Sequence, residues 1–189
     1  MRNVWDTLVR TTGNPSPTIA AQTNLFGNAN VGQLALTNLQ VAGQLASDQT
    51  YVILAIRAWL FFRGTNASTN YVGVASQLYL TLQLGDKPQF TAPCWYFPSG
   101  GGVYGSDPAT ENLNLGYPSQ NAILKLARPI VLPVRQNFFV NCAFFPIGST
   151  DIRTTLNTGA TDDQKVIMVV LDGLNAGNDN VPEMGLLAA

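Results

Sequence analysis

The segment from Tyr51 to Phe62 constrains the fold of this chain more than any other part of the sequence. It reads YVILAIRAWLFF and is rich in β-branched and aromatic residues, a composition that favours a long strand. Side chains alternate between the two faces of a strand. The even positions here are all apolar, and the odd positions add only one charge, Arg57. Both faces of this strand are therefore expected to be covered.

Several later segments predict further strands. Leu78, Leu80, Leu82 and Leu84 alternate with less apolar residues, and Gly85–Pro88 then supplies a turn. Apolar segments predict four more strands, at Ile123–Ala127, Ile130–Val134, Phe138–Phe145 and Val166–Leu171, the last ending at Asp172–Gly173. No long amphipathic helix is expected. This pattern is typical of an all-β fold, an antiparallel sandwich or jelly roll.

Two prolines indicate where one of these strands lies. Pro129 and Pro133 have no backbone N–H to donate, so they fit only an edge strand or a crossing between sheets. Arg128 and Arg135 flank this segment. Both arginines are therefore expected to face solvent or a neighbouring molecule.

The N-terminal part of the chain differs in composition. Residues 1–48 are rich in Asn, Gln, Gly, Ala and Thr, which predicts an extended arm plus one short strand. We divide the chain into an N-terminal arm (1–33), a jelly-roll domain (34–175) and a C-terminal tail (176–189). Apolar residues at helical spacing between Arg2 and Arg10 could contact a membrane surface or a partner, although a mobile or docked arm is the simpler interpretation. No secretory signal pattern is found at the start, so export is not expected.

Charged residues are scarce and histidine is absent. The 189 residues include 10 basic and 11 acidic ones, whereas a typical soluble domain is about a quarter charged. Uncharged polar residues or neighbouring subunits must cover the remaining surface, which favours a chain that works inside an assembly. Without histidine, the usual general base, metal ligand and activator of Ser or Cys nucleophiles are missing. No block of Lys and Arg is present to bind nucleic acid. An enzyme is not expected.

Three motifs resemble binding sites but fail on their context. Gly100–Gly105 satisfies G-x-G-x-x-G without the strand and helix that a dinucleotide site requires. Asp162 and Asp163 could ligate calcium, but their spacing matches no defined calcium loop. Cys94 and Cys142 lack metal-site spacing and are expected to be buried free thiols. No cofactor or metal is therefore predicted.

The long excursion after Phe90 gathers aromatic residues in a loop rich in Pro and Gly. Trp95, Tyr96, Phe97 and Tyr104 could form a platform for a sugar ring, or they could anchor a contact between subunits. The scarcity of charge around them favours the protein contact.

Four stretches carry a resemblance to a known family, spread over roughly residues 34–174. They are Leu39–Phe62, Gly85–Phe90 (GDKPQF), Leu126–Phe138 (LARPIVLPVRQNF) and Lys165–Leu174 (KVIMVVLDGL). Together they resemble β-barrel virion proteins of bacteriophages. In such proteins the final Asp-Gly-Leu is followed by Thr-Arg-Asp-Val, whereas this chain continues Asn-Ala-Gly-Asn.

The resemblance implies a jelly-roll coat subunit, located in the virion and assembled in the host cytoplasm. It would be a shell protein of an icosahedral phage, with contact to an internal membrane as one option, or a decoration protein. Its partners would be copies of itself and other capsid proteins. The alternative is a carbohydrate-binding or receptor-binding module. We predict these residues at the subunit interface: Trp5, Trp59, Trp95, Tyr96, Tyr104, Arg128 and Arg135.

Overall fold

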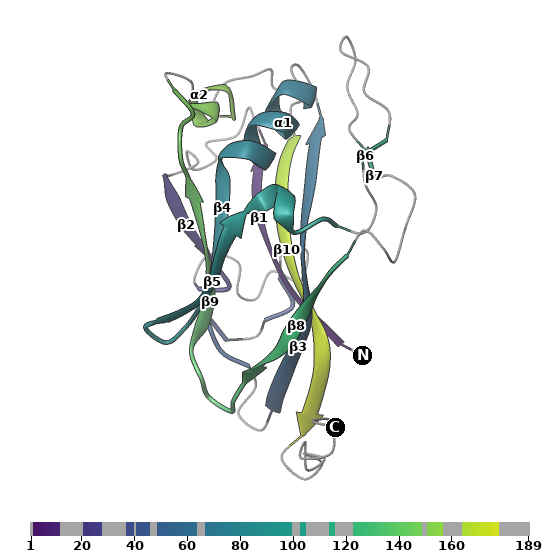
Figure 1. The fold of residues 1–189 in the computed structure, drawn as a ribbon, viewed down its shortest axis with the longest axis vertical. Coiled ribbons are helices and arrows are strands. Elements are labelled where there is room, and N and C mark those ends of the chain that lie inside the picture. The colour runs from purple at the N-terminus through teal and green to yellow at the C-terminus, as the bar shows by residue number, and fades with distance from the viewer. Residues whose placement is uncertain are drawn as a thin grey trace.

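The computed structural model shows a sandwich of two antiparallel sheets (Figure 1). It describes residues 2–11, 21–27, 37–39, 41–45, 49–63, 67–99, 103–104, 114–115, 123–148, 151–156 and 164–177. The two sheets have four strands each, and within the described residues their inner faces enclose one hydrophobic cluster. The antiparallel sandwich expected from the sequence is confirmed, in a fold that is mostly β and also contains helices.

The strands divide between the sheets in a regular way. Sheet A has the order β1 (Arg2–Thr11), β10 (Gln164–Gly177), β3 (Gln49–Arg63), β8 (Leu124–Leu132). Sheet B has the order β2 (Gln22–Leu25), β9 (Phe138–Phe144), β4 (Leu78–Leu84), β5 (Lys87–Pro93). A separate short pair consists of β6 (Val103–Tyr104) and β7 (Asn114–Leu115). The helices are α1 (Ala67–Gln77), the 3-10 helix η1 (Cys94–Tyr96) and α2 (Ile152–Leu156).

Alternation along the strands builds the core. On β4 the side chains of Leu78, Leu80 and Leu82 are fully buried, while Tyr79 and Thr81 between them are partly exposed. Burying an aliphatic side chain of this size contributes about 1.5–3 kcal/mol. The predicted strand is confirmed as β4, but the predicted turn is shorter than expected: it contains only Gly85 and Asp86, because β5 begins at Lys87.

The N-terminal arm is not confirmed. Residues 2–11, where helical spacing was noted, form strand β1 and pair with β10 over their whole length. Trp5 also bonds to the segment beside it, since its N–H donates to Asn38 Oδ1 (2.9 Å) and its carbonyl accepts from Thr37 Oγ1 (2.9 Å). β2 pairs with β9. The other boundaries of the predicted division stay a prediction.

No helix was predicted at residues 67–77, where the structure has α1, a helix of 11 residues. Its buried face carries Asn70, Val74 and Gln77, so two of the three buried positions are polar and the apolar periodicity of a surface helix is absent. Gln77 has a structural role, because its Oε1 accepts the N–H of Ile152 at the start of α2 (3.0 Å). At the other end of α2, the buried Lys165 of β10 donates to the carbonyls of Thr155 (3.3 Å) and Leu156 (3.0 Å).

Two strand predictions needed correction. The segments 123–127 and 130–134 form one strand, β8, at the edge of sheet A, as the prolines indicated. The last strand does not end at Asp172–Gly173 but continues to Gly177. Gly173 is needed for a close approach of two backbones, because a Cβ there would lie 2.0 Å from the Val52 carbonyl oxygen.

Replacing Gly173 by Ala is expected to lower the free energy of unfolding by about 1–3 kcal/mol, since β3 and β10 must separate to admit the methyl group. Urea unfolding followed by circular dichroism measures the change. Gly27→Ala is the matched control, because its Cβ would meet its first neighbour at 3.4 Å, and it should alter stability by no more than about 0.5 kcal/mol. Equal stability of the two variants would contradict this account of Gly173.

Cys94 and Cys142 are free thiols buried in the core, as the sequence predicts. Burial raises the pKa of Cys94 to about 12. The pKa of Cys142 is also raised, first by burial and then by Cys94 and Asp6. A thiol in an unfolded chain ionises near pH 8.5, as model peptides do. The unfolded chain therefore loses these protons at a lower pH than the native protein.

Stability is expected to fall as pH rises above about 8.5, and the Cys94 contribution should be fully lost by its native pKa of about 12. Each thiol contributes a slope of up to about 1.4 kcal/mol per pH unit. Cys94→Ala should make this fall less steep by one thiol's share, measured by urea unfolding from pH 8 to 10. An unchanged slope in the variant would show that the Cys94 thiol does not keep its proton in the native state.

Candidate functional site

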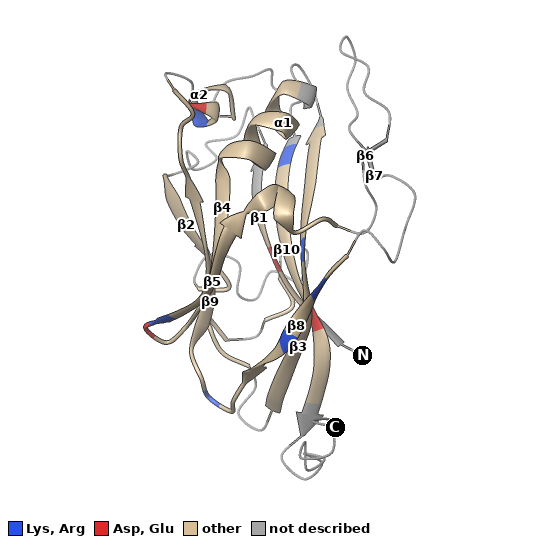
Figure 2. Ribbon diagram, in the orientation of Figure 1, with Lys and Arg blue, Asp and Glu red and all other residues tan. Residues whose placement is uncertain are grey.

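Charge is divided unevenly between the two sheets. The strands of sheet A carry nine charged residues, whereas those of sheet B carry one, Lys87, at the first position of β5 (Figure 2). Charged residues are thus much rarer in the strands of sheet B than in those of sheet A.

The outer face of sheet B carries a row of uncharged polar side chains. The register aligns Asn24, Asn141, Thr81 and Thr91 across all four strands. Asn141 Nδ2 donates to Asn24 Oδ1 (3.1 Å), and the hydroxyls of Thr81 and Thr91 are 2.9 Å apart. These groups therefore satisfy part of one another's hydrogen bonding without any charge.

Exposed aromatic side chains lie beside this row, toward α1. Phe145, which follows β9 and is 54% exposed, packs edge-on against Tyr79 with ring centroids 5.2 Å apart. Trp95, 63% exposed, packs edge-on against Tyr96 in η1 at 5.9 Å. Two further exposed apolar residues, Val72 of α1 and Ile147, come from neighbouring segments. We call the outer side chains of sheet B together with these exposed residues the uncharged face.

The predicted interface residues do not come together on one surface. Trp5 and Trp59 are half-buried on the outer face of sheet A, where Trp59 stacks on Phe61 (5.9 Å). Trp95 and Tyr96 belong to the uncharged face. Two arginines are exposed and lie apart from both groups: Arg128 on β8 and Arg135 in the turn after it. The side chain of Tyr104 lies outside the described residues. The prediction of a shared interface remains untested.

Strand β3 contains an irregularity that the sequence did not reveal. Ile53 and Ala55 have register partners on both β10 and β8, but Leu54 between them has none on either strand. The core-facing positions accordingly change from odd, Tyr51 and Ile53, to even, Ile56 and Ala58. Even and odd positions therefore exchange faces at Leu54, instead of keeping one face each along the whole of β3. A β-bulge of this kind re-aims side chains and bends the strand.

The pairing of β3 with both of its neighbouring strands is irregular at this bulge. The register of β10 shifts between Asp172 and Gly173. On β8, the four residues Leu126–Pro129 stand opposite Leu54 alone. A proline in such a bulge removes no ladder hydrogen bond.

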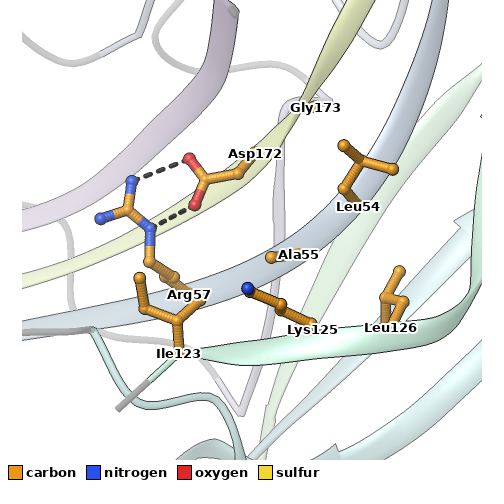
Figure 3. Close-up of a pocket in the computed structure, with 8 residues that line it drawn as sticks. All are labelled: Leu54, Ala55, Arg57, Ile123, Lys125, Leu126, Asp172 and Gly173. Atoms are coloured by element: carbon orange, nitrogen blue, oxygen red, sulfur yellow. Dashed lines mark hydrogen bonds and ion pairs between the residues drawn. The ribbon is translucent and has the colours of Figure 1, made fainter. Parts of the chain in front are cut away.

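A pocket of about 560 Å³ opens where the three irregularities meet. It is lined by Leu54, Ala55, Arg57, Ile123, Lys125, Leu126, Asp172 and Gly173 (Figure 3). Arg57 and Asp172 form a two-point ion pair, with Nε to Oδ2 at 2.5 Å and Nη2 to Oδ1 at 2.8 Å. Their side chains are 26% and 15% exposed. The guanidinium is therefore held by the carboxylate beside it.

Other acidic residues offer little binding chemistry in the described part of the chain. Asp151 pairs with Arg153 at 2.5 Å, and the pKa of Asp151 is lowered first by that hydrogen bond. Asp162 and Asp163 lie outside the described residues. Among the described residues, no three His, Cys, Asp or Glu side chains cluster as a metal site would require, and no helix is long and apolar enough to cross a membrane.

Comparison with models of known protein families, with curated proteins and with solved structures found no match. The candidate sites are therefore assigned from their geometry and chemistry. Sequence reasoning missed the pocket, although Arg57 was visible as the one charge in an apolar strand and Asp172 as the acid beside a glycine.

The Arg57–Asp172 pair is expected to stabilise the fold measurably. In a double-mutant cycle with Arg57→Ala and Asp172→Ala, we expect a coupling energy of about 1–2 kcal/mol, because a largely buried two-point ion pair exceeds a solvated one. Urea unfolding of the four proteins measures it. Additive effects of the two substitutions would mean that solvent screens the pair completely.

Proposed function

We propose that this chain is a structural virion protein, a coat subunit that packs with its own copies or with other capsid proteins in an icosahedral phage shell. The observation that carries the proposal is the uncharged face, with its row of amides and hydroxyls and its exposed aromatic residues. Interface centres are depleted in charge and enriched in aromatic residues. A face of this composition is suited to lose its water to a protein neighbour.

The area available is consistent with a contact between subunits. Three strands of seven residues and one of four, about 4.8 Å apart and with about 3.4 Å per residue, give a flat area of roughly 400 Å². A stable interface needs about 800 Å² from each partner. The exposed side chains near α1, such as Trp95 and Phe145, supply further surface beside the sheet. We therefore infer that both parts of the uncharged face take part.

The strand pairing supports a jelly roll. Leaving aside the short β6–β7 pair, the eight main strands pair first with last (β1–β10), second with seventh (β2–β9), third with sixth (β3–β8) and fourth with fifth (β4–β5). A long hairpin wound into a sandwich gives this nested pattern, which is the connectivity of the double-sheet jelly roll used by viral capsid domains. The topology is therefore compatible with the coat subunit that the sequence resemblance implied, and lectin domains share it.

A carbohydrate-binding or receptor-binding module is the second candidate, because Trp95 is the most exposed of the described aromatic residues. A sugar ring stacks on an open aromatic face. The Trp95 and Tyr96 rings meet at 79°, so they do not form one flat platform. The geometry therefore favours the coat subunit.

The proposal predicts that Phe145→Lys abolishes self-association, because it places a charge within the dehydrated contact. Light scattering with electron microscopy of the same fractions measures the assembly state. Leu174→Lys is the matched control: Leu174 is 50% exposed against 54% for Phe145, but it lies on β10 of sheet A. This variant should assemble as the unsubstituted protein does.

A protein that stays monomeric at high concentration, or that assembles equally well as Phe145→Lys, would overturn self-association through this face. In that event the Trp95→Ala variant tests the second candidate function, the carbohydrate-binding or receptor-binding module. Loss of retention on a glycan array, with the fold intact, would establish the binding module.

A further inference from the structure

The pocket at Leu54 has the size and lining of a site for a small ligand. Its volume of about 560 Å³ falls within the roughly 300–1,000 Å³ typical of such sites. Most of its wall is apolar, from Leu54, Ala55, Ile123 and Leu126. It lies beside the bulges of β3 and β8, on the outer face of sheet A and away from the uncharged face. The inference below does not rest on the proposed function.

The charges around the pocket do not cancel. Asp172 is engaged by Arg57 at two points, which leaves Lys125 as the remaining charged residue of the lining. Lys125 is exposed, and it takes part in neither of the ion pairs found within the described residues. Figure 3 places its ammonium on the side of the pocket where the Arg57–Asp172 pair lies. The lining therefore carries one uncompensated positive charge beside an apolar wall.

We propose that this pocket binds a small amphipathic monoanion, a carboxylate attached to an unbranched apolar chain. The carboxylate would meet the Lys125 ammonium, which has donors free for it, and the chain would cover the Leu54 and Leu126 wall. Charge-assisted hydrogen bonds of this kind are among the stronger ones available to a protein. A cationic ligand is disfavoured, because the Asp172 carboxylate already has its partner. A fully polar anion would leave the apolar wall in contact with water.

Calorimetric titration with decanoate, kept below its micelle concentration, tests this site on the purified full chain. We expect saturable binding, and weaker binding of decyltrimethylammonium, which has the same chain and the opposite charge. Lys125→Met keeps an apolar stem and removes the charge, so it should lower decanoate affinity by about tenfold or more. Lys87→Met, at the exposed start of β5, is the control and should bind as the unsubstituted protein does.

A second variant tests the apolar wall. Leu54→Gln should also weaken decanoate binding, and unfolding midpoints of all variants establish that each is folded. The proposal is overturned if decanoate shows no saturable binding, if Lys125→Met and Lys87→Met bind it equally, or if the cationic detergent binds as tightly. Such results would mean that the pocket is only a by-product of the bulges.

Discussion

Strand β3 lies between β10 and β8, so any change in its register is imposed on both of its neighbours. Leu54 is the residue at which this occurs, because it has no register partner on either side. Skipping it lets Tyr51 and Ile53 before the bulge, and Ile56 and Ala58 after it, all face the core. The tight approach of Gly173 to Val52 and the four-residue bulge of β8 fall at the same level of the sheet. The shape of sheet A thus depends on keeping β3 apolar toward the core.

The outer faces of the two sheets carry different kinds of polar group. On sheet A the charged groups next to the pocket include a pair that neutralises itself, Arg57 and Asp172. On sheet B the side chains of Asn141 and Thr81 bond to neighbours on the same face. Removing water from amides and hydroxyls that are already bonded costs much less than removing it from charges. Covering the outer face of sheet B with another protein surface therefore costs less free energy than covering the outer face of sheet A.

Local sequence signals predicted the strands well and the helices poorly. The β-branched and aromatic run at 51–62 and the leucines of β4 are signals that packing reinforces. Pro129 indicated an edge because a missing N–H has the same effect in any fold. Helix α1 was not predicted because Asn70 and Gln77 are buried where apolar residues are normally found. At Gly173 a turn signal was misleading, since the missing Cβ serves a close contact between strands.

The candidate site depends on relations that one sequence does not display. The pocket joins residues near positions 54, 125 and 172, and only the register of three strands brings them together. The interface residues were chosen as aromatic or flanking charged residues, and the structure separates them into groups on different elements. What the sequence did convey was the overall scarcity of charge; its concentration in one sheet became visible only with the fold.

Helix α2 has a property that follows from its two ends. A five-residue helix is far too short to persist alone in water. Its first turn is held by Gln77 from α1, and its last carbonyls are held by Lys165 from β10. The helix is thus held between α1 and β10, an inner strand of sheet A. It is therefore expected to form only while α1 and β10 are both in place, and to unfold as soon as either of them separates.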